Sequence, residues 1–307
     1  MVLETHQSVF IEENSPRDGI QNESAWFSLD ERISLIETLA ECGFQRIQIG
    51  AFVDSRKVPQ MVDTEKILDQ LPHNGKTVYS ALVLNECGMG RALASGIKHV
   101  SYFVSASDTH SRKNTNRSVE EGIRSAFRAI PMAKSHGMAV QGGIMNAFRC
   151  QLEGMVPPER VLRLVQAFTE MEVDEINLAD TAGLAHPPQV IELIGRVRDI
   201  CDTPITLHLH DTLGFGLVNA YAAWNVGVRR FDASCGGLGG CPFIPGVAGN
   251  IASEDMVNLF ESMGVRTGVH LPGLAVVIGM LRDKLKHPLW SRYGSLSSET
   301  AVNKGFM

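Results

Sequence analysis

Residues 175–226 read EINLADTAGLAHPPQVIELIGRVRDICDTPITLHLHDTLGFGLVNAYAAWNV, and this stretch decides the fold. It contains the same pattern twice: a short apolar run with β-branched residues, followed by a longer amphipathic run. The pattern predicts strands at Glu175–Leu178 and Ile205–Leu207, and helices at Pro188–Cys201 and Gly214–Val226. Because strands that alternate with helices pair in parallel, the stretch predicts a parallel sheet covered by helices.

The same alternation extends from this stretch toward both ends of the chain. The other expected strands are Ser8–Glu12, Arg46–Gly50, Thr77–Leu82, His99–Val104, Met138–Ile144 and Arg230–Asp232. The other expected helices are Asp30–Cys42, Thr64–Leu71, Asn85–Ser95, Ser118–His136, Pro158–Met171 and Ser253–Met263. Eight strand–helix units in about 250 residues predict an α/β fold, the TIM (β/α)8 barrel.

The alternative fold is an open, doubly wound sheet. The first strand is not followed by the glycine fingerprint GxGxxG, which counts against that alternative. We therefore assign residues 1–268 to a catalytic barrel. Residues 269–307 form a short extension, with a helix at about Pro272–Leu285 and a polar tail, Ser295–Met307.

Composition narrows the class of protein. Hydrophobic residues make up 44% of the 307 residues and charged residues 20%, which is typical of a globular protein with a large core. The net charge of −6 argues against a nucleic-acid or anionic membrane partner. No apolar run reaches the roughly 18 residues of a membrane span. The six cysteines form no CxxC pair and follow no signal peptide, so we expect free thiols and a cytoplasmic protein.

Barrel enzymes carry their chemistry at the carboxyl ends of the strands, so residues just after predicted strands are the candidates. After the first strand come Arg17 and Asp18. A carboxylate there can hold a hard cation, and the neighbouring guanidinium can stabilise a developing oxyanion. A plain polar turn explains this segment equally well when it is taken alone.

A stronger signal is the sequence Leu-His-Leu-His-Asp-Thr at 207–212, at the end of the seventh strand. His208 and His210 are two positions apart on extended backbone, so both imidazoles point to the same side. Together with Asp18 they predict a metal site in which oxygen ligands favour Mg²⁺ or Mn²⁺. The remaining histidines, His110 among them, are scattered singly, and we interpret them as surface or packing residues.

Two further segments follow strands six and eight. Asp180 comes directly after strand six, where it can act as a base, support a ligand or cap a turn. After strand eight, four glycines separate Cys235 from Cys241. Glycines let the backbone approach a ligand closely, so we expect Cys241 to be reactive and the other five cysteines to be structural.

These segments together resemble the hydroxymethylglutaryl-CoA lyase family, within a superfamily of metal-dependent barrels that also includes isopropylmalate and homocitrate synthases. The resemblance runs from about Ile11 to Gly268. Its most specific parts are PRDGIQNE at 16–23, FVDSRKVPQM at 52–61, HLHDT at 208–212 and GGLGGCPFIPGVAGN at 236–250.

The resemblance implies a role for each matching residue. Asp18, His208, His210 and Asn250 would bind Mg²⁺ or Mn²⁺. Arg17 would stabilise the enolate oxygen, and Cys241 would protonate the enolate carbon. Asp180 would lie near the substrate hydroxyl, with His208 assisting as a catalytic group. The substrate contacts would include Glu13, Gln21, Gln48 and Ala51.

Two of these substrate contacts depart from the family pattern. Gln48 stands where the family has a glutamate, and Ala51 stands where it has a serine. One interpretation is that Gln48 selects a substrate with its carboxylate on the carbinol carbon, such as citramalyl-CoA. The other is that Gln48 simply supports Arg17.

The expected activity is divalent-metal-dependent cleavage of 3-hydroxy-3-methylglutaryl-CoA, or a close analogue, to acetyl-CoA and acetoacetate. CoA enters as part of the substrate, and we expect a homo-oligomer, a dimer or tetramer. The alternatives are a lyase for citramalyl-CoA, an acyl-CoA condensing synthase, or a degenerate barrel that serves as a binding protein.

Overall fold

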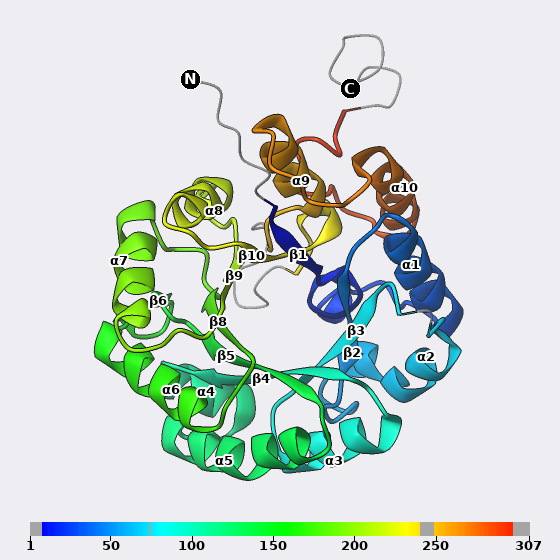
Figure 1. Ribbon diagram of the computed structural model, residues 1–307. Coiled ribbons are helices and arrows are strands. Elements are labelled where there is room, and N and C mark those ends of the chain that lie inside the picture. The colour runs from blue at the N-terminus through cyan, green and yellow to red at the C-terminus, as the bar shows by residue number, and fades with distance from the viewer. Residues whose placement is uncertain (1–7, 74, 240–248, 297–307) are drawn as a thin grey trace.

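The computed structural model describes residues 8–73, 75–239 and 249–296, and in this part of the chain eight strands close into a barrel ringed by helices (Figure 1). The strand order around the barrel is β1, β10, β9, β8, β5, β4, β3, β2, and every neighbouring pair is parallel. The strands are β1 (Phe10–Glu13), β2 (Arg46–Ala51), β3 (Val78–Val83), β4 (His99–Ser105), β5 (Ala139–Met145), β8 (Glu175–Asp180), β9 (Ile205–Leu209) and β10 (Arg230–Ala233). The predicted TIM barrel is confirmed.

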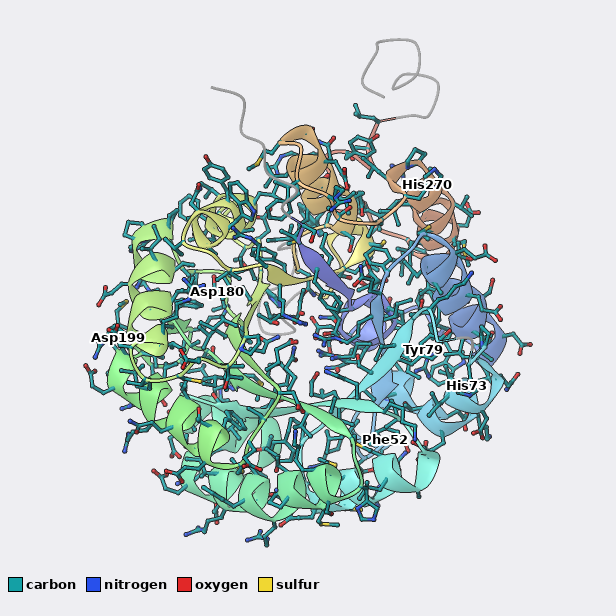
Figure 2. All side chains as sticks on the ribbon, in the orientation of Figure 1. Phe52, His73, Tyr79, Asp180, Asp199 and His270 are labelled. Atoms are coloured by element: carbon teal, nitrogen blue, oxygen red, sulfur yellow. The ribbon has the colours of Figure 1, made fainter. Side chains whose placement is uncertain are left out.

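The helices cover the outside of the barrel. They are α1 (Leu29–Glu41), α2 (Thr64–Gln70), α3 (Glu86–Ser95), α4 (Asp108–Thr115), α5 (Val119–Ser135), α6 (Pro158–Glu170), α7 (Pro187–Arg198), α8 (Gly216–Asn225), α9 (Ser253–Ser262) and α10 (Leu274–Lys284). The buried faces of most of them are apolar, the exceptions being α4 and the first turn of α9, and α1 and α5 begin with full capping boxes at Ser28 and Ser118. In Figure 2, His73 and Asp199 lie on the outer rim, whereas Asp180 lies nearer the centre. None of the helices in the described ranges is long and apolar enough to cross a bilayer.

Some elements were not expected from the sequence. Helix α4 is almost entirely polar, so it shows no apolar period, and its only start signal is Ser107, whose hydroxyl accepts the His110 N–H at 3.1 Å. Short helical segments also follow β1, β2 and β10, namely η1 (Ser15–Gly19), η2 (Pro59–Met61) and η3 (Cys235–Gly237), and a further one, η4 (Leu271–Gly273), lies between α9 and α10. A small hairpin, β6 (Arg149–Cys150) with β7 (Gly154–Met155), follows β5. All of them are too short to produce a periodic signal.

The inside of the barrel holds a buried ion cluster centred on Arg46. Its guanidinium lies 2.7 Å from the Glu12 carboxylate and 2.8 Å from the Glu175 carboxylate. Burial by itself would raise the pKa of Glu175, but the charge of Arg46 outweighs it and lowers that pKa to about 2. Because breaking one partner of such a cluster leaves a buried charge unpaired, the cluster ties β1, β2 and β8 together beneath the site.

Candidate active site

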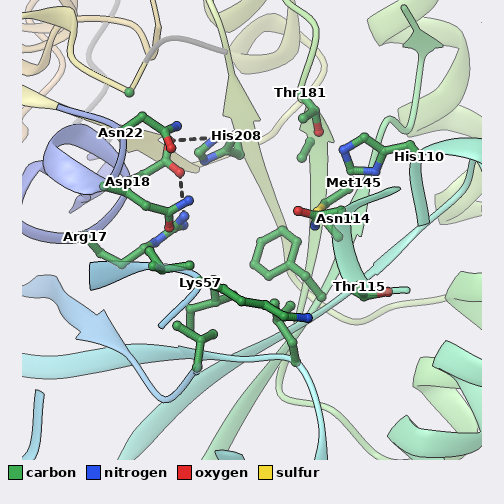
Figure 3. A pocket seen from close by; sticks show the side chains of 18 of the residues that line it. Arg17, Asp18, Asn22, Lys57, His110, Asn114, Thr115, Met145, Thr181 and His208 are labelled. Carbon is green, nitrogen blue, oxygen red and sulfur yellow. Dashed lines mark hydrogen bonds and ion pairs between the residues drawn. The ribbon is translucent and has the colours of Figure 1, made fainter. Parts of the chain in front are cut away.

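A cavity of about 460 Å³ opens among the segments that follow the barrel strands (Figure 3). Among the expected site residues, Arg17, Asp18, Gln21, His208 and His210 line it. Further lining residues are Asn22, Val53, Asp54, Lys57, Val58, Leu82, Leu84, Asn85, Phe103, His110, Asn114, Thr115, Arg117, Met145, Ala179, Thr181 and Gly239. The cavity therefore mixes an apolar wall with a strongly polar end.

Segment η1 sets the polar end, because it turns directly after β1. Its residues Arg17 and Asp18 are joined by a 2.5 Å contact between Arg17 Nη1 and Asp18 Oδ1. Burial alone would raise the pKa of Asp18, but the positive charge of Arg17 and the two neighbouring histidines outweigh it and hold that pKa well below its usual range. Asp18 is therefore a carboxylate, the form that binds a cation.

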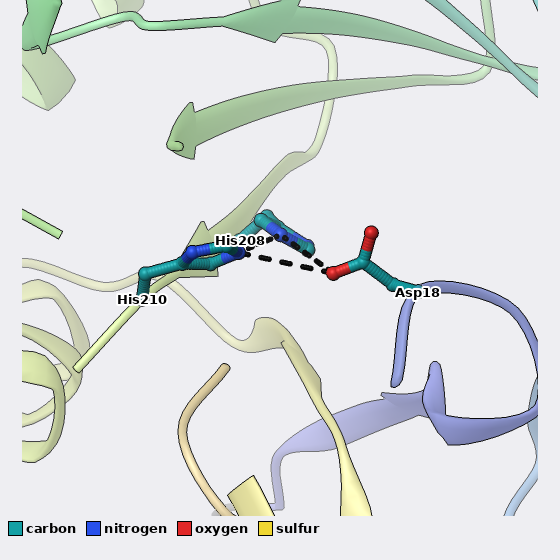
Figure 4. A group of neighbouring side chains, drawn as sticks. All are labelled: Asp18, His208 and His210. Atoms are coloured by element: carbon teal, nitrogen blue, oxygen red, sulfur yellow. Dashed lines mark hydrogen bonds and ion pairs between the residues drawn. The ribbon is translucent and has the colours of Figure 1, made fainter. Parts of the chain in front are cut away.

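The two histidines lie opposite Asp18 (Figure 4). The Nε2 atoms of His208 and His210 are 3.1 Å apart, and they lie 3.9 Å and 3.8 Å from Asp18 Oδ2. The ligand atoms of all three residues fall within 4.8 Å of one another. Two cis ligands of an octahedral Mg²⁺, each about 2.1 Å from the ion, would be about 3.0 Å apart. The spacing of the two nitrogens therefore fits a divalent cation.

Asn250 completes the expected ligand set. Its amide nitrogen lies 2.7 Å from Asp18 Oδ2 and 3.0 Å from the Leu238 carbonyl oxygen. Its Oδ1 is buried and has no hydrogen-bond partner among the described residues. A buried amide oxygen normally has a partner, so this atom is free to bind a cation. The four predicted ligands thus meet in one place, and they fit Mg²⁺ or Mn²⁺ in type.

Cys241 lies outside the described residues. The segment that leads to it passes very close to the ligands: a Cβ on Gly239 would come within 2.4 Å of Asn250 Nδ2 and 2.8 Å of Asp18 Oδ2. Gly239 also has a φ of +94°, a conformation that favours glycine. On the return, the Gly249 carbonyl accepts the Asp211 N–H at 2.8 Å. Both described flanks of this segment are therefore anchored beside the ligand group.

Asp180 and Glu13 are two further expected site residues, and in the structure both accept backbone N–H groups. Both are fully buried, and neither lines the cavity. The oxygens of Asp180 accept the N–H groups of Leu184 and Ala185 at 3.1 Å and 2.9 Å, which is the turn-capping alternative. Glu13 accepts the N–H of Ser15 at 2.8 Å and that of Cys235 at 3.1 Å. This geometry gives both carboxylates a loop-holding role, and their roles toward the substrate remain predictions.

The two residues that depart from the family pattern also sit behind the cavity wall. The Gln48 oxygen accepts from Arg17 Nε, and its NH2 group donates to Ser101 Oγ at 3.3 Å. Ala51 is fully buried and does not line the cavity. Of the two interpretations of Gln48, this geometry favours support of Arg17 over direct contact with the substrate.

His110 was misjudged from the sequence. It lines the cavity, and its Nδ1 lies 3.2 Å from Ser105 Oγ (Figure 3). Burial lowers its pKa, which favours the neutral imidazole. Lys57 and Arg117 add two cations to the lining. Its position in the sequence could have indicated a place in the cavity wall, because His110 comes shortly after β4 just as Arg17 comes shortly after β1.

Comparison with known proteins shows the family. The family model described as HMGL-like matches residues 8–279. A hydroxymethylglutaryl-CoA lyase of Bacillus subtilis is 36% identical over 287 residues, which is 93% of this chain and 96% of the relative. The chain belongs to the hydroxymethylglutaryl-CoA lyase family. It is therefore a carbon–carbon lyase by family.

Other members of the family broaden the comparison. The (R)-citramalyl-CoA lyase of Chloroflexus aurantiacus is 40% identical over 294 residues, 92% of this chain and 93% of the relative. A crystal structure of the Bacillus subtilis lyase superposes with a TM-score of 0.91 at 36% identity, covering 94% of this chain and 97% of that one. A structure from Acinetobacter baumannii, in complex with coenzyme A and 3-methylmalate, also gives 0.91, at 33% identity and 98% coverage of both chains.

Proposed function

We propose that this family member cleaves a branched 3-hydroxyacyl-CoA bearing a second carboxylate, by a divalent-metal-dependent retro-Claisen reaction. The observation that carries the proposal is that Asp18, His208 and His210 line one cavity beside Arg17, with Asn250 in contact with Asp18. A cation ligand set and an oxyanion-stabilising guanidinium are the two features that this chemistry needs.

Asp18, His208, His210 and the oxygen of Asn250 would hold the metal ion. When bound, Mg²⁺ or Mn²⁺ would supply Lewis-acid activation of the substrate hydroxyl and orient the substrate. Asp18 carries the fixed negative charge of this set, since its pKa is held low. A mixed set of carboxylate, imidazole and amide ligands without thiolate suits these ions better than a structural zinc site.

The remaining chemistry needs a base, an oxyanion stabiliser and a proton donor. The base takes the hydroxyl proton, a role that the family resemblance gives to the neighbourhood of Asp180 and His208, of which His208 lines the cavity. The C2–C3 bond then breaks, with its electron pair passing into a thioester enolate while the hydroxyl carbon becomes a carbonyl. Arg17 is 7% exposed and is held by Gln48 and Asp18, so its charge is preorganised for the enolate oxygen. Cys241 then donates a proton to the enolate carbon, which releases acetyl-CoA.

Two substrates fit this class, and a different finding supports each. (R)-citramalyl-CoA, which would give acetyl-CoA and pyruvate, is supported by the relative at 40% identity. 3-Hydroxy-3-methylglutaryl-CoA, which would give acetyl-CoA and acetoacetate, is supported by the Bacillus subtilis lyase. We place citramalyl-CoA first, because that relative has the higher identity over a similar length.

The test is to incubate the purified protein and Mg²⁺ with each thioester and to identify both products by mass spectrometry. Asp18→Asn is the matched control, since it keeps the size of the side chain and removes its charge. Cleavage of one thioester by the wild type but not by the control supports the proposal. Failure to cleave either thioester with metal present contradicts it, as does net condensation in the reverse direction alone.

We further propose that the protein is a cytoplasmic homo-oligomer, a dimer or tetramer. This rests on the six cysteines without a CxxC pair and on the family resemblance. Light scattering after size-exclusion chromatography measures the assembly directly, and a monomer at micromolar concentration contradicts the oligomer.

A further inference from the structure

Asp232 touches one of the candidate metal ligands from the far side. It lies on β10 and pairs in register with His208 on β9. Its Oδ2 is 3.1 Å from His208 Nδ1 and 2.8 Å from Asn177 Nδ2. Asp232 is only 2% exposed and is outside the cavity lining, so it reaches the site through His208 alone.

We propose that Asp232 is a positioning residue that fixes the ring orientation and tautomer of His208. A carboxylate beside Nδ1 accepts a hydrogen bond from the Nδ1–H group, so the neutral ring keeps its proton on that nitrogen. The lone pair of Nε2 then faces His210 and Asp18, toward which Nε2 already points. This inference rests on the proposed metal-dependent function, because it assigns Asp232 a role in preparing one metal ligand.

The surroundings of Asp232 support a dedicated role. A buried carboxylate is costly unless its charge is compensated. Among the described residues, Asp232 contacts no Lys or Arg directly; His208 is its contact that can carry a positive charge, and Arg46 is near enough to interact with it electrostatically. Its bonds to His208 and Asn177 are both made by Oδ2, and Oδ1 has no hydrogen-bond partner in the described part of the chain. The carboxylate is thus held by Asn177 in a position that serves His208.

The two histidines differ in this respect. His210 Nδ1 is buried and has no hydrogen-bond partner among the described residues. Asp232 therefore orients the His208 ring through its Nδ1 atom. The orientation of the His210 ring depends instead on its position directly after β9.

The test measures Mn²⁺ affinity in the absence of substrate, by electron paramagnetic resonance of the free ion. Asp232→Ala removes the acceptor and should weaken Mn²⁺ binding by about 10–100-fold, the usual effect of losing such a partner. Asp232→Asn keeps one oxygen acceptor and should fall between Ala and wild type. Ser80→Ala is the matched control: its hydroxyl bonds Glu12 inside the same barrel without touching His208, so Mn²⁺ affinity should stay at the wild-type value.

A second measurement is made on the wild-type protein and needs a variant only to assign the signal. In metal-free wild-type protein, the ¹⁵N shifts of His208 at alkaline pH report which ring nitrogen carries the proton, with the signal assigned by its loss in His208→Gln. Protonation at Nδ1 is the expected result. An Nε2–H tautomer overturns the proposal, and so does unchanged Mn²⁺ affinity in a folded Asp232→Ala. If the wild type binds no Mn²⁺ at all, the proposed function fails instead.

Discussion

The amide nitrogen of Asn250 lies 2.7 Å from Oδ2 of Asp18, although the two residues are 232 positions apart in the sequence. Closure of the barrel produces this contact, because β1 pairs with β10 and thereby brings the first loop against the last one. The candidate metal site therefore depends on the place where β1 and β10 close the barrel, which we call the seam. Substitutions at the seam should change metal binding at the site.

Gly239→Ala tests that dependence. The added Cβ would come within 2.4 Å of Asn250 Nδ2 and 2.8 Å of Asp18 Oδ2, so the two ligands must move. We expect Mn²⁺ affinity and turnover to fall by at least about tenfold, the low end of the effect of disturbing a ligand shell. Gly264→Ala is the control, since it has a similar positive φ of +74° but no atom within 4 Å of the new Cβ. Equal metal affinity in Gly239→Ala and Gly264→Ala would contradict the dependence of the metal site on the seam.

Cys241→Ala tests the proton donor. If Cys241 protonates the enolate, turnover should fall by about 10²–10⁴-fold while KM changes little, because the thiol acts after binding. Alkylation should inactivate the enzyme, and substrate should protect it. The matched controls are Cys87→Ser, because Cys87 is exposed and will also be labelled, and Cys235→Ala, because burial raises the pKa of that thiol and keeps it unreactive. Normal turnover in Cys241→Ala would rule the role out.

The barrel and the pair of candidate ligand histidines could be predicted because their signals are local, whereas Asn250 was expected only from the family resemblance. Alternating apolar runs mark the strands, and the spacing of His208 and His210 places both rings on one side. Placement across the barrel could not be predicted in the same way. Gln48 departs from the family pattern in the sequence, yet whether its amide faces the substrate or Arg17 depends on the register of β2, which shifts between Gln48 and Gly50.

Asp180 and Asp232 illustrate the same limit. Asp180 is the last residue of β8, and Asp232 is the last but one of β10. Their positions in the sequence therefore make both of them candidate site residues. Only the structure shows that Asp180 binds backbone N–H groups whereas Asp232 binds a ligand histidine. The contact of Asp232 with His208 joins two strands, and such contacts leave no periodic signal in a single chain.

Gln48→Glu tests whether the Gln48 side chain determines substrate specificity. The geometry predicts that it does not, because its oxygen is bound to Arg17 and its NH2 group to Ser101. We expect kcat/KM for citramalyl-CoA and for hydroxymethylglutaryl-CoA to change by the same factor. A shift of the ratio toward hydroxymethylglutaryl-CoA by about tenfold or more, equal to about 1.4 kcal/mol, would instead make Gln48 a specificity residue.

His99 gives the fold a predicted sensitivity to acid. Burial, and next the charge of Arg46, lower the pKa of His99 to about 3. Between about pH 6.5, the ordinary value for histidine, and pH 3, only the unfolded chain binds a proton at this position. The free energy of unfolding should therefore fall as pH falls, with this residue contributing up to about 1.4 kcal/mol per pH unit.

His99→Gln removes that contribution and keeps an acceptor for the Arg46 Nη1–H, which lies 3.0 Å from His99 Nε2. Urea unfolding curves of both proteins between about pH 4 and 6.5 supply the comparison. The variant should show a weaker pH dependence than the wild type over this range. Parallel curves would mean that His99 is protonated in the native protein, contrary to its burial.

The most direct test of the whole account is acyl-CoA cleavage before and after metal removal, with the products identified. Protein treated with a chelator and then desalted should lose activity on both thioesters, and added Mg²⁺ or Mn²⁺ should restore it. His210→Ala should stay folded and should not recover. Recovery should yield acetyl-CoA together with pyruvate or acetoacetate. Full cleavage by metal-free protein would contradict the account, because the group formed by Asp18, His208, His210 and Asn250 would then have no part in the reaction.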